Sequence, residues 1–405
     1  MNISVLDRFL KYVSVGSQSD TDSATVPSTP GQTELARLLV GELKDMGAQA
    51  ELDDDSGIVY ASIPSNVEGN VPVIGWVAHV DTAPGVSGSG VKPRIVRSYD
   101  GGDILLNPEQ GMVLSPAVFP ELADYLGQDL VVTDGTTLLG ADDKAGVAEI
   151  MDMAASFLLN PERPHGEIRI AFTPDEEIGR GADRFDVKGF GADFAYTADG
   201  GPVGEIEYEN FNAAGAKVVV HGLNIHPGSA KGKMVNSQLI AMEFQSLLPV
   251  GQRPELTEGY EGFFHLLGMK GEVERSELHY IIRDHDMEKF EEKKAVMTAA
   301  ADFINRKYGA GTLELTLKDS YYNMKKCIEP CMYVVERAKK AMAAAGMNPV
   351  EVPIRGGTDG ARLSYEGLPC PNLCTGGENY HGRFEFIPIE DMEKCVRMLV
   401  EILTA

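Results

Sequence analysis

Three short apolar runs constrain the fold of this chain more than any other feature. Residues 71–80 (VPVIGWVAHV) are almost continuously apolar, and similar runs recur at 167–172 and 194–197. Apolar runs of this length without polar alternation are typical of strands that are covered on both faces. A helical pattern at 144–159 separates the first two runs. Strands that alternate with helices in this way predict an α/β fold with a covered sheet.

The same alternation is found toward both ends of the chain. Apolar residues follow a helical period over 32–46, and Gly47 stands where that helix would stop. Toward the C-terminus, the pattern predicts a helix at 331–345, short strands at 350–354 and 372–375, and a closing helix at 389–403.

The middle of the chain follows a different order. It reads as a strand (AKVVVHG), a helix at 236–248, two strands on either side of Gly271, a helix at 287–308 and a strand at 312–317. That order, β-α-β-β-α-β, is a known compact α+β motif. We therefore expect a smaller α+β lid domain, residues 211–319, inserted into an α/β catalytic domain made of residues 1–210 and 320–405.

Charge and composition exclude several function classes. The chain has 61 acidic and 36 basic residues, a formal net charge of −25. Such a charge repels nucleic acids and anionic membrane surfaces, so small or cationic partners fit better. We find no signal peptide and no run of the roughly 18 apolar residues that a membrane helix needs. The five cysteines lack the spacing of a zinc knuckle or redox pair, which favours a cytoplasmic location.

Histidines and carboxylates gather where the predicted strands end and the 144–159 helix begins. Each has a structural interpretation when taken alone: a satisfied histidine, a helix cap, a turn or an exposed loop. The residues are His79, Asp81, Asp142, Glu176, Glu177, Asp199 and His381. The carboxyl ends of strands in an open α/β sheet meet at the ligand crevice, so these side chains can converge. Nitrogen and oxygen ligands without thiolate suit zinc, manganese or cobalt, and the set predicts a catalytic site with two metal ions.

Eight ordered segments resemble the peptidase T family of tripeptide aminopeptidases, within the M20 dizinc metallopeptidases. They are HVDTAPG (79–85), LLGADDKAG (138–146), FTPDEEIGRGA (172–182), YTADGGPVGEIEYENF (196–211), HPGSAKGKMVNS (226–237), IIRDHD (281–286), IRGGTDGARLS (354–364) and CTGGENYHGRFEF (374–386). The resemblance extends through essentially the whole chain. It implies a zinc-peptidase-like catalytic domain with an inserted lid or dimerisation domain.

The resemblance also implies a role for each site residue. His79 and Asp199 would hold one zinc ion, Glu177 and His381 the other, and Asp142 would bridge them. Glu176 would be the general base, and Asp81 would orient His79. A cis peptide would follow Asp142. The expected substrate-binding residues are His226, Arg283, Arg355 and, more weakly supported, Asn236.

The implied activity is release of the N-terminal residue from tripeptides, using water that two Zn²⁺ ions bind and a glutamate activates. Co²⁺ or Mn²⁺ could replace zinc. The expected partner is a small peptide substrate, and the chain could also form a homodimer. The same site would also serve a dipeptidase, a carboxypeptidase or an N-acyl amino acid deacylase. A nucleotide-binding protein is disfavoured because the glycine-rich stretches 85–90 and 356–360 lack the G-x-G-x-x-G order. A non-catalytic binding protein would be expected to have lost Glu176 or a metal ligand.

Overall fold

The computed structural model describes residues 3–404, and contacts between Cα atoms divide them into two compact units. Unit 1 runs to residue 208 and also contains 324–352 and the chain from 358 onward. Unit 2 contains 209–323 and 353–357. The predicted inserted domain, 211–319, lies within unit 2. Unit 2 also includes the short segment 353–357, which the prediction assigns to the catalytic domain.

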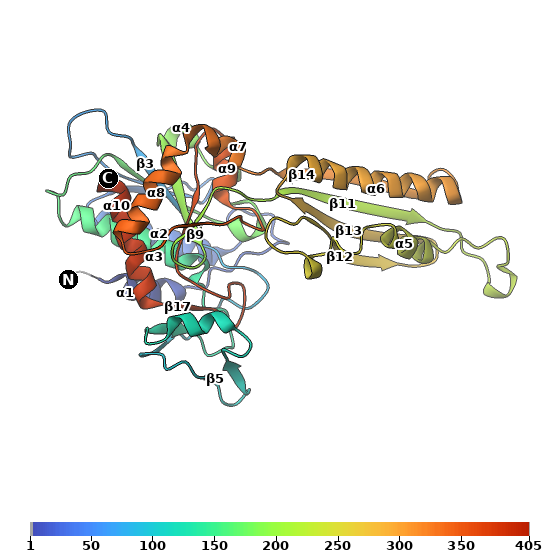
Figure 1. Cartoon of the computed structure of the whole chain (residues 1–405), viewed down its shortest axis with the longest axis horizontal. Helices are drawn as coiled ribbons and strands as arrows, with labels where there is room; N and C mark the ends of the chain where they lie inside the picture. The colour runs from blue at the N-terminus through green and yellow to red at the C-terminus, as the bar shows by residue number, and fades with distance from the viewer. Residues whose placement is uncertain (1–2, 405) are drawn as a thin grey trace. The chain divides into compact units, whose positions relative to one another are not determined.

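Unit 1 is built on an eight-stranded mixed sheet (Figure 1). Its strands, in spatial order, are β1 (Gln49–Leu52), β2 (Val59–Ile63), β8 (Ile168–Thr173), β3 (Ile74–His79), β9 (Phe194–Gly200), β16 (Asn372–Cys374), β10 (Glu205–Glu207) and β15 (Val350–Glu351). The inner strands β8, β3, β9 and β16 are parallel. The predicted strand at 350–354 forms only over Val350–Glu351.

Helices cover both faces of this sheet. All six residues of β3 are buried, and alternate residues of a strand face opposite sides. The helices of unit 1 are α1 (Val5–Val13), α2 (Pro30–Met46), α3 (Ala141–Leu158), α4 (Val187–Phe190), α7 (Lys325–Ile328), α8 (Tyr333–Ala344), α9 (Asp359–Tyr365) and α10 (Ile389–Thr404). Gly47 ends α2 with a φ of 103°, as its position predicted. No helix within residues 3–404 is long and apolar enough to cross a membrane.

A second, smaller β-structure in unit 1 was not predicted. It consists of a three-stranded sheet, β17 (Phe386–Pro388), β7 (Leu130–Val132) and β4 (Arg94–Val96), and a hairpin of β5 (Ile104–Asn107) and β6 (Met112–Leu114). Strands of three or four residues are too short to show a clear period in the sequence. Tyr99, Leu122, Tyr125 and Phe386 form part of its apolar core.

Unit 2 has the predicted β-α-β-β-α-β order. Its antiparallel sheet contains β12 (Phe263–Gly271), β13 (Arg275–Asp284), β11 (Asn212–His221) and β14 (Leu313–Tyr321) in that spatial order, with helices α5 (Ser237–Ser246) and α6 (Met287–Tyr308). Phe244 of α5 and Phe290 of α6 pack with Val218 and Val220 of β11 in one apolar core. The predicted fold class, an α/β protein with this α+β module, is confirmed.

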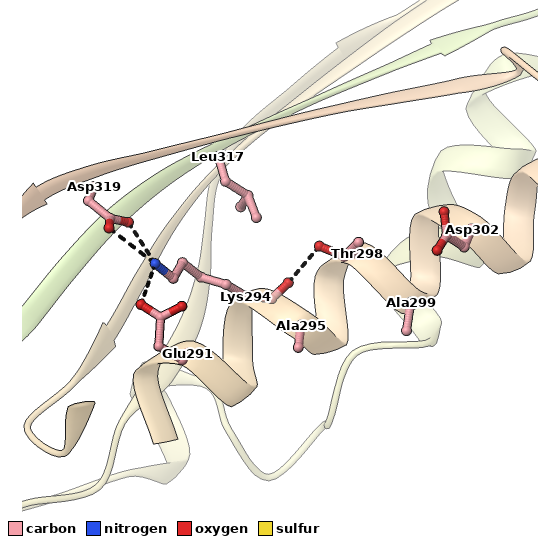
Figure 2. Close-up of a pocket in the computed structure, with 8 residues that line it drawn as sticks. All are labelled: Glu291, Lys294, Ala295, Thr298, Ala299, Asp302, Leu317 and Asp319. Atoms are coloured by element: carbon pink, nitrogen blue, oxygen red, sulfur yellow. Dashed lines mark hydrogen bonds and ion pairs between the residues drawn. The ribbon is translucent and has the colours of Figure 1, made fainter. Parts of the chain in front are cut away.

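A groove lies between α6 and β14 in unit 2 (Figure 2). Lys294 forms ion pairs there with Glu291 at 2.7 Å and Asp319 at 3.0 Å. None of the predicted site residues lines this groove. Lys294 is the basic residue that lines the groove, and the carboxylates of Glu291 and Asp319 balance its charge.

Helix α3 and strand β9 approach each other closely at Gly146. A Cβ atom added to Gly146 would lie 1.8 Å from the carbonyl oxygen of Ala198. We therefore expect Gly146→Ala to destabilise the protein by about 1–3 kcal/mol, because backbone atoms would have to move. Gly41→Ala in α2 is the matched control, since a Cβ there meets no atom within 4 Å. It should be neutral or stabilising by up to about 1 kcal/mol. Thermal unfolding followed by circular dichroism checks both, and an unchanged midpoint for Gly146→Ala would contradict the close packing.

Candidate metal centre

The carboxyl ends of the four parallel strands of unit 1 place the predicted ligands together. His79 is the last residue of β3, and Asp199 lies near the end of β9. Glu177 follows β8, and His381 follows β16. Asp142 stands in the first turn of α3, which packs against β3 and β9. The fold thus brings five segments that are distant in the sequence to one edge of the sheet.

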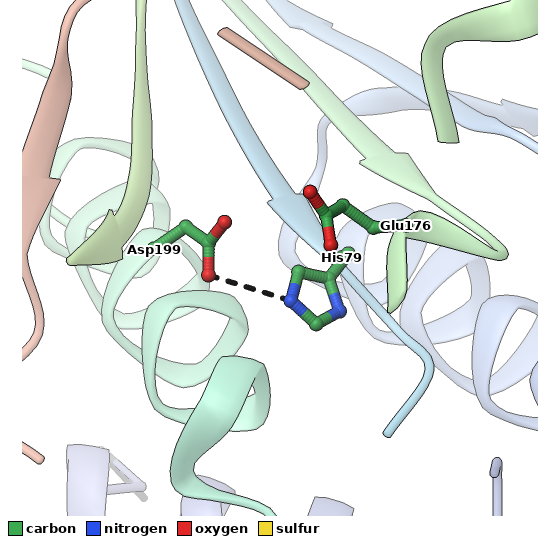
Figure 3. A group of neighbouring side chains, drawn as sticks. All are labelled: His79, Glu176 and Asp199. Atoms are coloured by element: carbon green, nitrogen blue, oxygen red, sulfur yellow. Dashed lines mark ion pairs between the residues drawn. The ribbon is translucent and has the colours of Figure 1, made fainter. Parts of the chain in front are cut away.

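The first group of side chains surrounds His79. Its Nε2 atom lies 3.0 Å from Oδ1 of Asp142 and 3.4 Å from Oδ1 of Asp199. Figure 3 shows the carboxylates of Glu176 and Asp199 turned toward the His79 ring. Each of the three residues offers a ligand atom within 4.8 Å of the others. His79 is buried, whereas Asp199 keeps 13% of its side chain exposed. The group can therefore be reached from solvent on its carboxylate side.

Asp142 connects this group to a second one. Its Oδ1 atom faces His79, and its Oδ2 atom lies 2.8 Å from Nε2 of His381. The same His381 nitrogen is 3.0 Å from Oε1 of Glu177. Each oxygen of Asp142 therefore faces a different histidine, and each histidine has a second carboxylate of its own. Such a carboxylate, placed between two imidazoles, has the arrangement of a ligand shared by two ions.

The pKa values in this cluster reflect crowded, buried acids. Burial raises the pKa of Asp199 to about 7 and raises that of Glu176 well above its usual range. Burial opposes the charged form of His79, but the carboxylates of Asp199, Asp142 and Asp81 raise its pKa well above the usual value. Hydrogen bonds to Asp142 and Glu177 raise the pKa of His381 to about 11. Among residues 3–404, the two imidazoles are the basic groups that form ion pairs with Asp142, Glu177 and Asp199.

The donor set suits a divalent cation. Among the described residues, no lysine or arginine forms an ion pair with Asp142, Glu176, Glu177 or Asp199. Imidazole nitrogens and carboxylate oxygens are ligands for zinc, manganese and cobalt. The residues present therefore fit a metal centre, and positive charge at this position would relieve the repulsion between the carboxylates.

The carboxylate of Asp81 contacts residues of both groups. Its carboxylate is fully buried, and Oδ1 lies 3.3 Å from Nδ1 of His79. The same oxygen accepts a hydrogen bond from the backbone N–H of Glu176 at 3.0 Å, while Oδ2 accepts one from Glu177 at 3.1 Å. A carboxylate at Nδ1 favours the tautomer whose Nε2 lone pair is free to bind a metal. Asp81 thus contacts His79, the residue that it is predicted to orient.

Two further acids beside the cluster were not singled out by the sequence. Asp143 accepts hydrogen bonds from the backbone N–H groups of His79 at 3.0 Å and Gly146 at 3.2 Å. The peptide bond between Asp142 and Asp143 is cis, as the family resemblance implied. Glu385, in the loop after His381, accepts backbone hydrogen bonds from the start of α3. Neither acid shows a spacing that distinguishes it from a solvated charge.

The predicted substrate-binding residues all lie in unit 2. Asn236 caps α5, because its side chain accepts a hydrogen bond from the Gln238 N–H at 3.0 Å. His226 is exposed, and its Nδ1 accepts a hydrogen bond from the Gly228 N–H at 3.1 Å. Arg283 donates to the carbonyl of Ile282 at 2.9 Å.

Arg355 is held within unit 2 by several contacts. Its Nη1 donates to the carbonyls of Gly259 at 2.6 Å and Glu261 at 3.0 Å, and its Nη2 donates to Oγ1 of Thr257 at 3.1 Å. The guanidinium also lies over the ring of Phe211 at 5.1 Å. These contacts attach the segment 353–357 to unit 2, which the sequence did not indicate.

Comparisons with known proteins identify relatives of this chain. The family model for peptidase family M20/M25/M40 matches residues 133–405. Peptidase T from Alkaliphilus oremlandii is 56% identical over 402 residues, which cover 99% of this chain and 98% of that protein. The chain belongs to peptidase family M20/M25/M40. The resemblance found in the sequence is thus confirmed.

Solved structures share the fold of this M20 peptidase over its full length. The aminopeptidase PepT from Bacillus cereus has a TM-score of 0.78 at 26% identity, covering 100% of this chain and 98% of that one. A tripeptidase from Staphylococcus aureus has a TM-score of 0.80 at 23% identity, with the same coverage.

The position of Asp142 generates a prediction about metal binding. We expect metal-stripped protein to bind two Zn²⁺ ions per chain, and Asp142→Ala to weaken the binding of both, because each oxygen faces one group. Asp199→Ala should weaken only one of the two. The control is Asp134→Asn, in the loop before α3, where the carboxylate contacts Thr136 and Lys92. Equilibrium dialysis with measurement of bound zinc checks this, and two ions bound by Asp142→Ala with unchanged affinity would contradict the shared role.

Proposed function

We propose that this chain is a metal-dependent aminopeptidase that releases the N-terminal residue from tripeptides. The observation that carries the proposal is the Asp142 carboxylate, which lies between His79 and His381 at the carboxyl edge of the sheet. Membership of an M20 peptidase family supports hydrolysis of a peptide bond. The 56% identity to a peptidase T and the likeness to an aminopeptidase support action at the N-terminus of a tripeptide.

The proposed metal centre uses five ligands. His79 and Asp199 would hold one ion, Glu177 and His381 the other, and Asp142 would bridge them. We propose zinc as the ion, with Co²⁺ or Mn²⁺ able to replace it. When bound, such a pair of ions polarises a carbonyl and lowers the pKa of water to near neutrality.

Glu176 is the proposed general base. It belongs to the His79 group, and its side chain forms no hydrogen bond with another described residue. Its backbone N–H is held by Asp81, which fixes where the side chain begins. Glu176 would therefore accept a proton from the attacking water and return it to the leaving amine. Its neighbour Glu177 instead faces His381, so the two adjacent acids do different work.

We propose that unit 2 contributes substrate contacts through His226, Arg283, Arg355 and Asn236. The Nδ1 atom of His226 accepts the Gly228 N–H, so the neutral ring carries its proton on Nε2. An exposed Nε2–H can donate a hydrogen bond to a substrate carbonyl or to the oxyanion that forms from it. The arginines are of the type that binds a peptide carboxylate. A cytoplasmic location is proposed with this function, from the spacing of the cysteines.

Hydrolysis of matched peptides tests the proposed function. We expect metal-stripped protein to regain activity with Zn²⁺ and to release only the first residue of tripeptides with a free N-terminus. Matched dipeptides, tetrapeptides and N-blocked tripeptides are the controls. Cleavage of a dipeptide, release of the last residue, or removal of an acyl group from an amino acid would contradict the proposed specificity.

Replacing Glu176 by glutamine tests the general base. The amide keeps the shape of the side chain but cannot accept the proton, so we expect a loss of kcat of about 100-fold or more. Bound zinc should stay at the level of the parent protein. Glu167→Gln, at the opposite end of β8 where Glu167 pairs with Arg169, should leave both kcat and zinc content unchanged. Near-normal turnover by Glu176→Gln would refute the assignment of the base.

A further inference from the structure

Glu385 links two segments that carry candidate metal ligands. Its side chain is buried, with 1% of the residue exposed. Oε2 accepts hydrogen bonds from the backbone N–H groups of Leu139 at 2.7 Å and Gly140 at 2.8 Å. Oε1 accepts one from the N–H of Asp142 at 3.1 Å. One carboxylate therefore binds three backbone donors that lie about 245 residues earlier in the chain.

These three donors belong to a helix start that has no cap of its own. Gly140 is the N-cap residue of α3, with a φ of 83° and no side-chain cap. The first N–H groups of a helix lack intrahelical acceptors, and a carboxylate at this end is favoured by the helix dipole. Asp142 has a φ of −84° and a ψ of 104°, so its backbone departs from the helix. The orientation of Asp142 therefore depends on contacts from outside α3.

The other end of the link is the loop that carries His381. Glu378 and Phe386 pair through two backbone hydrogen bonds, 2.9 and 3.1 Å long, and so close the loop 378–386 at its base. Tyr125, in the apolar core beside the smaller sheet, donates a hydrogen bond to Glu378 at 2.6 Å. His381 lies within this loop with a φ of 61°, and 54% of its side chain is exposed. Few side-chain contacts hold His381, so the backbone of the loop must place it.

We propose that Glu385 is a positioning residue that fixes Asp142 relative to His381. It stands four residues after His381 and binds the backbone of Asp142 directly, so it sets the approach of Asp142 Oδ2 to His381 Nε2, which is 2.8 Å. The His79 side has a support of its own, because Asp143 accepts the backbone N–H of His79 at 3.0 Å. Asp81 contacts both sides, through His79 and through the N–H of Glu177. Loss of Glu385 therefore acts most strongly on the ion that Glu177 and His381 would hold. This role rests on the metal centre of the proposed function.

The test uses the full-length Glu385→Gln variant. The amide keeps the shape, but it removes the charge and turns an NH₂ group toward N–H donors. Competition with a chelator should show one of the two Zn²⁺ ions bound about 10- to 100-fold more weakly, the range usual for residues that support a metal ligand. The other ion should keep its affinity within a few-fold. In peptide hydrolysis at saturating zinc, kcat should fall more than KM rises.

Glu390→Gln is the matched control. Glu390 lies five residues later, and its carboxylate also accepts a backbone N–H, from Asp129 at 3.1 and 3.2 Å. It contacts no candidate ligand in unit 1. Glu385→Gln should lower the unfolding temperature of the metal-free protein more than Glu390→Gln does, because Glu385 binds three backbone N–H groups and Glu390 binds one. Only Glu385→Gln should change zinc affinity.

Three outcomes would overturn the proposal. One is parent-like zinc affinity for both sites in Glu385→Gln, and another is an equal loss at both sites. The third concerns a Glu385→Gln variant that does not fold. In that case Glu385→Asp is used, because it keeps the charge on a shorter side chain. Unchanged affinity for both ions in Glu385→Asp would refute the role. If the parent protein itself does not bind two ions, the proposed function fails, and this result is distinct because it precedes any comparison of variants.

Discussion

The contact on which the rest of the site depends is that of one carboxylate, Asp142, with two imidazoles. Its oxygens lie 3.0 Å from His79 and 2.8 Å from His381, and each histidine faces a further acid. These acids repel one another, and no lysine or arginine among the described residues forms an ion pair with them. Such a cluster stays in place only if the surrounding backbone is held firmly and a cation balances the charge. The fold around the site supplies the first condition.

The segments that carry this cluster are held by carboxylates that accept hydrogen bonds from backbone N–H groups, and not by basic side chains. Asp81 binds the N–H groups of Glu176 and Glu177, and Asp143 binds that of His79. Glu385 binds three donors at the start of α3. A carboxylate that accepts backbone hydrogen bonds fixes a segment without introducing a positive charge that would compete with a metal ion. The supporting shell is therefore acidic as well, and its attraction for a divalent cation adds to that of the ligands.

The sequence predicted the elements that have a clear period and missed those that do not. The apolar runs that became β3, β8 and β9 and the order of elements in unit 2 are long enough to be recognised. The strands near Arg94–Val96 and Leu130–Val132 have three residues each, too few for periodicity. The supporting role of Glu385 could not be predicted, because its partners lie far away in the sequence. The contacts of Arg355 with the carbonyls of Gly259 and Glu261 were missed for the same reason.

The candidate metal ligands and the candidate substrate-binding residues belong to different units of the chain. The proposed ligands in unit 1 would act on the reacting bond and on water, which determines the type of reaction but not which end of a peptide is cut. Recognition of a short peptide also needs groups that complement its terminal charges. The candidate groups for a carboxylate, Arg283 and Arg355, and the hydrogen-bond donor His226 all belong to unit 2. Under the proposed function, specificity can therefore change through residues of unit 2 while the five proposed ligands of unit 1 stay the same.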